Sequence, residues 1–127
     1  MLQNLKNGLA ANGFDLVEFF NGQAVQGSPQ FETTHKEAKY RFANDANLQK
    51  FKKSPDAFTP QYGGYCAIAM SEGKQVNPNP KSFVVQDGKL YFFTRLLFGL
   101  IDAKRQWVKA PEEKQKLADA AYKKLNG

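Results

Sequence analysis

The stretch SFVVQDGKLYFF, residues 82–93, decides the fold class of this chain. Two apolar runs, residues 82–86 and 89–93, flank the pair Asp87-Gly88. Asp-Gly between apolar runs is a strong hairpin signal, because both residues tolerate the positive φ angles of a type I′ turn. We therefore predict a β-hairpin with a type I′ turn over this stretch.

Another hairpin, the first along the chain, is predicted over residues 30–43, so the stretch 82–93 is the second hairpin. Tyr40 and Phe42 alternate with Lys39 and Arg41, as in a half-buried strand, and residues 30–35 are the candidate partner strand. Helical signals surround both hairpins, in residues 1–11, 16–20, 44–53, 65–71, 95–108 and 111–127. This order predicts an α+β fold, with two short β-hairpins packed with several short helices and a C-terminal helical pair.

Capping residues and apolar spacing define these helices. Asp15, Thr94 and either Asn44 or Asp45 are predicted N-caps, and Pro111 is predicted to open the last helix. The predicted apolar stripes are Leu2, Leu5 and Leu9 in the first helix and Leu117, Ala121 and Leu125 in the last.

Composition and charge narrow the class of protein. The chain has 127 residues, of which 42% are hydrophobic and 13% aromatic, which predicts one globular domain with a real core. The net charge of +6 is concentrated in residues 36–53 and 101–127. Acidic residues interrupt the second basic segment and no reading motif accompanies either, so no nucleic-acid partner is predicted. The longest apolar run, residues 96–101, is too short to span a membrane.

Several blocks of sequence resemble a known family. The blocks are Asn12-Gly13-Phe14-Asp15-Leu16-Val17, Tyr40-Arg41-Phe42, Pro60-Gln61-Tyr62-Gly63-Gly64-Tyr65-Cys66-Ala67, Asp87-Gly88-Lys89-Leu90-Tyr91 and Trp107. On these blocks, the chain resembles the YHS-domain family, and more specifically its small stand-alone bacterial members. The organisation expected from this resemblance is an N-terminal helical extension over residues 1–12, a YHS domain over residues 13–108, and a C-terminal helix over residues 109–127 that packs on or flanks the domain.

The resemblance has limited consequences for function. Some YHS domains attached to heavy-metal transporters resemble metal-binding modules with three cysteines, but the corresponding positions here hold Glu18, Ala43 and Asn47. That metal site is therefore not implied for this chain. Many stand-alone members resemble exported proteins. The N-terminus has no apolar run typical of a secretory signal, so we expect a periplasmic protein if a signal was removed and a cytoplasmic one otherwise.

The single cysteine, Cys66, lies in the most distinctive block and has two interpretations. A free cysteine is usually a small buried apolar residue, which is the structural interpretation. The functional interpretation joins Cys66 to Met70, four residues further along the predicted helix, and to His35, the only histidine. A thiolate, a thioether and an imidazole together suit a soft metal ion such as copper in its Cu(I) state. The alternative interpretation of His35 is a solvated or hydrogen-bonded loop residue that binds no metal.

Residues 62–65, Tyr62, Gly63, Gly64 and Tyr65, are the candidate lining of a small-ligand pocket. Glycine backbones approach a ligand closely, and tyrosine hydroxyls bind its polar atoms. The alternative interpretation is a tightly packed turn whose glycines adopt positive φ.

These observations favour a binding protein, with a soft metal ion or a small ligand in a pocket around residues 62–70 and the first hairpin. The alternative is a protein–protein interaction module without a small ligand, which docks its basic helices at residues 44–53 and 104–124 on an acidic partner. No catalytic triad, phosphate-binding loop or cofactor fingerprint is recognised, so the chain is not predicted to be an enzyme. A thiol enzyme using His35 as its base is the third hypothesis.

Overall fold

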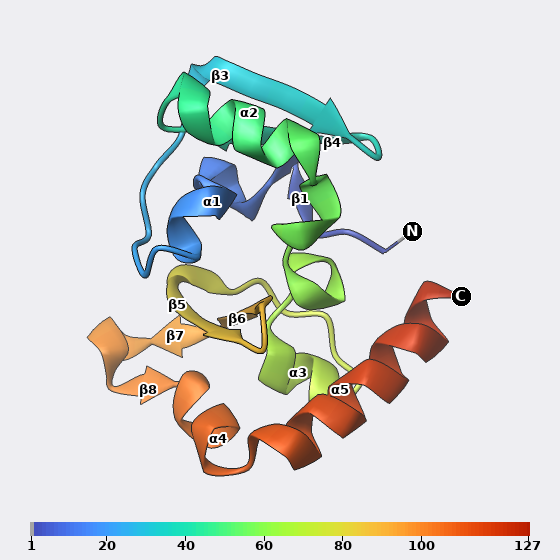
Figure 1. The fold of residues 1–127 in the computed structure, drawn as a ribbon. Coiled ribbons are helices and arrows are strands. Elements are labelled where there is room, and N and C mark those ends of the chain that lie inside the picture. The colour runs from blue at the N-terminus through green and yellow to red at the C-terminus, as the bar shows by residue number, and fades with distance from the viewer. Residues whose placement is uncertain (1) are drawn as a thin grey trace.

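The computed structural model describes residues 2–127, and its helices and short strands confirm the predicted α+β class (Figure 1). The first hairpin, α1 and α2 form one half of the molecule, and the second hairpin, α3, α4 and α5 form the other. Each half has its own apolar cluster.

The first hairpin pairs β3 (Ser28–His35) with β4 (Ala38–Phe42) and confirms the predicted strands. The side chains of Ala38, Tyr40 and Phe42 are buried, as the alternation predicts. Helix α2 (Asp45–Lys53) begins after the predicted N-cap Asn44 and packs Phe51 against the strand. The ring centroid of Phe51 lies 4.8 Å from that of Tyr40 and 5.0 Å from that of Phe42.

The buried carboxylate of Asp15 joins three elements of this half. As predicted, Asp15 caps α1 (Leu16–Phe19), accepting hydrogen bonds from the backbone N–H groups of Val17 and Glu18. Its second oxygen accepts from the backbone N–H of Ala43, just after β4, and from the side-chain amide of Asn47 in α2, both at 2.8 Å. One fully buried carboxylate thus holds α1, β4 and α2 together.

The predicted N-terminal helix over residues 1–12 is wrong. Strands β1 (Leu5–Lys6) and β2 (Leu9–Ala10) form a small hairpin there, followed by the 3₁₀ turn η1 (Ala11–Gly13). Asn7 and Gly8 adopt φ angles of 54° and 81°, which suit a tight hairpin turn. Strand β2 also pairs in parallel with β4, and this sheet contact outweighs the weak tendency of so short a segment to form a helix.

The second hairpin separates the two apolar clusters. It pairs β5 (Asn79–Gln86) with β6 (Lys89–Phe93), and positive φ at Asp87 and Gly88 confirms the predicted type I′ turn. Strand β6 is buried on both faces: Leu90 and Phe92 belong to the cluster of the first half, whereas Tyr91 and Phe93 belong to that of the second.

The chain after β6 departs from the prediction. Thr94 does not cap a helix: β7 (Arg95–Leu96), the 3₁₀ turn η4 (Leu97–Gly99) and β8 (Ile101–Asp102) form a third small hairpin, and α4 (Lys104–Lys109) follows. Leu97 and Gly99 adopt positive φ, which a continuous helix excludes. The helical spacing of the leucines in this segment predicted a helix with an apolar face, but these side chains are exposed and pack against no core.

The remaining elements are the turns η2 (Pro55–Ala57) and η3 (Gln61–Gly64), the buried helix α3 (Ala67–Ser71) and helix α5 (Pro111–Asn126). Pro111 opens α5 as predicted, and α4 and α5 form the predicted C-terminal helical pair. The predicted inner stripe of α5 holds only at Ala121, which packs against the core, because Leu117 and Leu125 are exposed. Ala118 is instead fully buried, since close packing of α5 against α3 leaves room only for a small side chain.

None of the helices within residues 2–127 combines the length and the apolar character needed to cross a membrane.

Candidate functional site

A pocket of about 570 Å³ lies where the N-terminal segment, the turn of the first hairpin, η3 and α5 meet. This volume falls within the range of roughly 300–1,000 Å³ that is usual for small-molecule sites. Of the residues predicted to form a site, Tyr62, Gly63, Gly64 and His35 line this pocket. Tyr65 packs against the core of the second half and does not.

The Tyr62-Gly63-Gly64 turn forms one wall of the pocket through an unusual backbone. All three residues adopt left-handed conformations, with φ angles of 59°, 64° and 87°. A Cβ on Gly63 would lie only 2.2 Å from the carbonyl oxygen of Leu2, and the backbone N–H of Asn4 donates to the Gly63 carbonyl at 2.8 Å. Glycine is therefore required at position 63 for close approach of the N-terminal segment.

The Tyr62 side chain extends from this wall of the pocket into the core. Its hydroxyl donates to Asp119 Oδ1 of α5 at 2.8 Å, and its ring centroid lies 5.9 Å from those of Tyr91 and Tyr122. Burial, reinforced by the hydrogen bond to Asp119, raises the pKa of Tyr62. The Tyr122 hydroxyl donates to the carbonyl oxygen of Leu2 at 2.7 Å. Both phenols are therefore neutral and fixed, and they tie α5 to η3 and to the N-terminal segment.

The opposite wall carries a polar cluster around Asp56, which follows α2. His35 Nε2 lies 3.0 Å from Asp56 Oδ1, and Lys36 Nζ lies 3.4 Å from the same oxygen. The hydrogen bond from His35, followed by the contact with Lys36, lowers the pKa of Asp56. Burial, together with the negative charge of Asp56, raises the pKa of Tyr40 beneath it to about 12. The cluster therefore presents an ionised carboxylate held by His35 and Lys36 at the pocket edge.

Three lysines from three different elements line the pocket: Lys36 in the β3–β4 turn, Lys89 at the start of β6 and Lys123 in α5. With Asp56 and Asp119 as the acidic lining residues and His35 neutral, three positive and two negative charges leave +1. Within residues 2–127, Lys89 and Lys123 form no ion pair with a carboxylate. Their ammonium groups are available to an anionic ligand.

The candidate metal ligands are divided between the two halves. Cys66 and Met70 are fully buried in the cluster of the second half, where Cys66 Sγ lies 3.1 Å from Thr94 Oγ1 and accepts the Thr94 backbone N–H at 3.2 Å. His35 instead bonds Asp56 and lies edge-on to the Phe51 ring of the other cluster. The structure brings Cys66 and Met70 together and leaves His35 apart. Over the described residues, no three His, Cys, Asp or Glu side chains are grouped to hold a metal ion.

Sequence reasoning missed several residues of the pocket. Asp119, Tyr122 and Lys123 carry no local motif, and Lys89 was noted only within the Asp87-Gly88 block, because the fold alone brings β6 and α5 to the Tyr62-Gly63-Gly64 turn. By contrast, the two glycines indicated a special backbone, and both adopt positive φ.

Glu18, Ala43 and Asn47 lie close together around the Asp15 carboxylate. The Asn47 amide donates to Glu18 Oε2 at 2.7 Å, and both Asn47 and the backbone of Ala43 donate to the Asp15 carboxylate. A polar network occupies this place in the present chain.

Comparison with known proteins finds no match to this chain, whether among family models, curated proteins or solved structures. Function must therefore be inferred from the chemistry of the pocket.

Proposed function

We propose that this chain is a YHS-type binding protein for a small organic anion, held in the pocket between η3, the β3–β4 turn and α5. The convergence of Lys36, Lys89 and Lys123 on one pocket is the observation that carries the proposal. Lys36 is paired with Asp56, but Lys89 and Lys123 form no ion pair within residues 2–127, and the lining keeps a net charge of +1, which favours an anionic occupant.

The remaining lining suits the body of such a ligand. Leu5, Ala10 and the rings of Tyr40 and Tyr62 supply apolar surface, whereas the lysines lie at exposed positions. An apolar or aromatic body with one carboxylate, sulfonate or phosphate group would match both features.

The convergence of positions 18, 43 and 47 supports the resemblance to the YHS family, because a three-cysteine metal site requires those positions to be neighbours. The separation of His35 from Cys66 and Met70 favours an organic ligand over a soft metal ion at the predicted residues.

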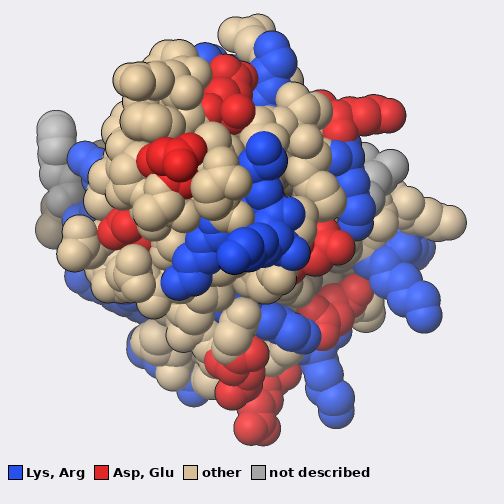
Figure 2. All heavy atoms as spheres, turned by 45° about the horizontal axis from the view of Figure 1, so that its top comes forward, with Lys and Arg blue, Asp and Glu red and all other residues tan. Residues whose placement is uncertain are grey.

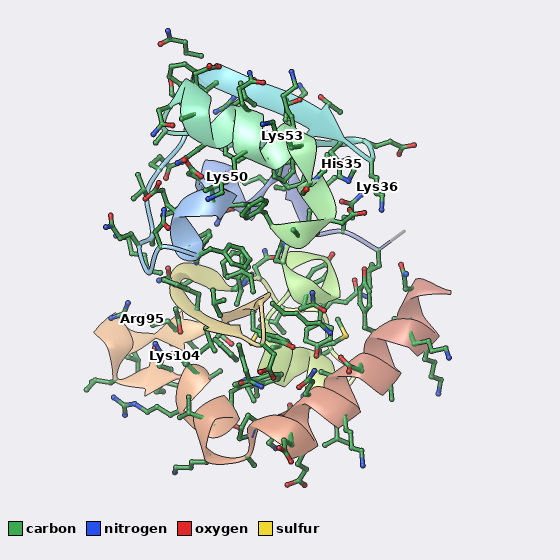
Figure 3. The ribbon with its side chains drawn as sticks, in the orientation of Figure 1. His35, Lys36, Lys50, Lys53, Arg95 and Lys104 are labelled. Atoms are coloured by element: carbon green, nitrogen blue, oxygen red, sulfur yellow. The ribbon has the colours of Figure 1, made fainter. Side chains whose placement is uncertain are left out.

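A basic surface on α2 favours the interaction module as the second candidate. Lys50, Lys52 and Lys53 lie in the last turn of the helix, all exposed. Figure 2 shows Lys and Arg side chains gathered on this side of the molecule, and Figure 3 shows Lys50 and Lys53 projecting from α2. Such a surface would attract an acidic protein partner.

The proposal is tested with the fluorescent anion anilinonaphthalene sulfonate, which combines an aromatic body with a sulfonate. We expect saturable binding at one site, weakened about fivefold or more by Lys123→Glu. Lys124→Glu is the matched control, because it changes the net charge equally on the same helix but lies outside the pocket. Leu100→Ser controls for binding of the dye to exposed apolar side chains outside the pocket.

Equal weakening by Lys123→Glu and Lys124→Glu would show that the dye responds only to net charge, and it would reject the pocket as an anion site. Loss of binding in Leu100→Ser would reject it too. In either case, the interaction module becomes the better hypothesis.

A further inference from the structure

The hairpin formed by β7, η4 and β8 presents large apolar side chains to solvent. The exposed fractions are 55% for Leu96, 62% for Leu97, 75% for Leu100 and 53% for Ile101. Clustered exposure of this kind marks an interaction surface, whereas a single exposed leucine does not.

The hairpin is firmly attached at its base, so these side chains are held outward. The Ala103 N–H donates to the Thr94 carbonyl at 2.9 Å, and the Asp102 carboxylate accepts from the Lys104 N–H and from the Ser82 hydroxyl. Leu97 adopts a left-handed φ of 51°, an unfavourable conformation for leucine, yet its side chain gains no burial in the fold. The hairpin forms a projecting edge of the molecule (Figure 1).

Basic residues flank the apolar tip. Between positions 95 and 109, four basic residues and one acidic residue give a net charge of +3: Arg95, Lys104, Arg105, Lys109 and Asp102. The Arg95 guanidinium lies beside the tip, 3.2 Å from where a Cβ on Gly99 would be. Figure 3 labels Arg95 on the hairpin and Lys104 at the start of α4, which follows it. The single acid, Asp102, accepts hydrogen bonds from Ser82 and the backbone of Lys104, and its side chain is only 17% exposed. Its second oxygen also lies 3.9 Å from Arg95 Nε, a contact that leaves the Arg95 side chain 40% exposed.

We propose that the β7–β8 hairpin docks the protein on the surface of a membrane that contains anionic phospholipids. The leucine and isoleucine side chains enter the boundary between headgroups and acyl chains, and Arg95, Lys104 and Arg105 bind lipid phosphates. An anionic surface complements the +3 segment, whereas a second copy of this chain would bring two +3 segments together. This docking is independent of the pocket proposed above.

The proposal is tested by co-sedimentation of the full chain with phosphatidylcholine vesicles that contain about 30% phosphatidylserine. We expect the double variant Leu100→Ser, Ile101→Ser to reduce the vesicle partition coefficient about tenfold or more. The double variant Leu117→Ser, Leu125→Ser is the matched control, because it removes two exposed apolar side chains from α5 and should bind as the wild type does.

Three further measurements distinguish the sources of binding. Lys104→Glu with Arg105→Glu should weaken binding about tenfold or more, as should removal of phosphatidylserine from the vesicles. A tryptophan at the tip, Leu100→Trp, should shift its emission to the blue on vesicles, whereas Trp107, fully buried in the free protein, should not respond in the wild type.

The proposal is overturned if the wild type fails to sediment with anionic vesicles, or if the tip and control variants bind equally. Concentration-dependent dimers that Leu100→Ser, Ile101→Ser abolishes, without any vesicle binding, would identify a second copy as the occupant instead.

Discussion

Gly63→Ala isolates the close contact on which the pocket wall depends. Alanine in the left-handed conformation costs about 1 kcal/mol relative to glycine. The new Cβ would lie 2.2 Å from the Leu2 carbonyl oxygen, so the N-terminal segment must move. That movement breaks the hydrogen bonds from Asn4 to Gly63 and from Tyr122 to Leu2, at about 1 kcal/mol each. The expected loss of unfolding free energy is therefore about 3 kcal/mol.

Gly73→Ala is the matched control for this prediction. Gly73 has a similar φ of +77°, but a Cβ there meets nothing within 4 Å, so only the conformational cost of about 1 kcal/mol remains. Urea denaturation followed by the fluorescence of Trp107, the only tryptophan and fully buried, measures both variants. Equal losses of stability in the two variants would refute the close-contact argument. Because Gln3 and Leu5 line the pocket, Gly63→Ala should also weaken binding of anilinonaphthalene sulfonate.

Three further predictions follow from buried polar groups. Asp15→Asn should cost about 3–5 kcal/mol of unfolding free energy in urea, because an amide cannot accept from the four donors around this carboxylate; a loss no larger than that of the exposed Asp45→Asn would contradict this. The raised pKa values of Tyr40, at about 12, and of Tyr62 predict stability that is full below pH 10 and falls as the pH rises from about 10 to 12, where the unfolded chain ionises first; an unfolding free energy that stays constant between about pH 9 and pH 12 would disprove it. The fully buried thiol of Cys66 should react with Ellman's reagent only on unfolding. In a Cu(I) titration, we do not expect the wild type to bind one equivalent that both Cys66→Ala and His35→Ala lose; if both variants lose it, the metal site becomes the better hypothesis.

Local chemistry explains which parts of the fold were predictable. The Asp87-Gly88 turn and the caps Asp15 and Asn44 act through residues within a few positions, so the sequence alone specifies them. The N-terminal segment could not be predicted in this way, since β2 is held by pairing with Lys39, thirty residues away. The buried face of α5 likewise depends on how closely α3 approaches, which no spacing of leucines reveals.

The candidate site divides in the same way. The positive φ angles of Gly63 and Gly64 are a local demand that the sequence indicates, and residues of the β3–β4 turn line the same pocket. The grouping of Cys66 with His35 relied on residue types alone, and tertiary packing placed them against different clusters. Lys123 entered the pocket only because the C-terminal helix crosses the Tyr62 turn.

A map of amide chemical shifts locates the bound anion residue by residue. In two-dimensional ¹H–¹⁵N NMR spectra of the full chain titrated with anilinonaphthalene sulfonate, we expect saturable shifts confined to the pocket, at Gly63, Gly64, His35 and Lys123. Shifts centred instead on the lysines of α2 or on the β7–β8 hairpin, with the amides of Gly63 and Gly64 unchanged, would contradict the pocket as the binding site.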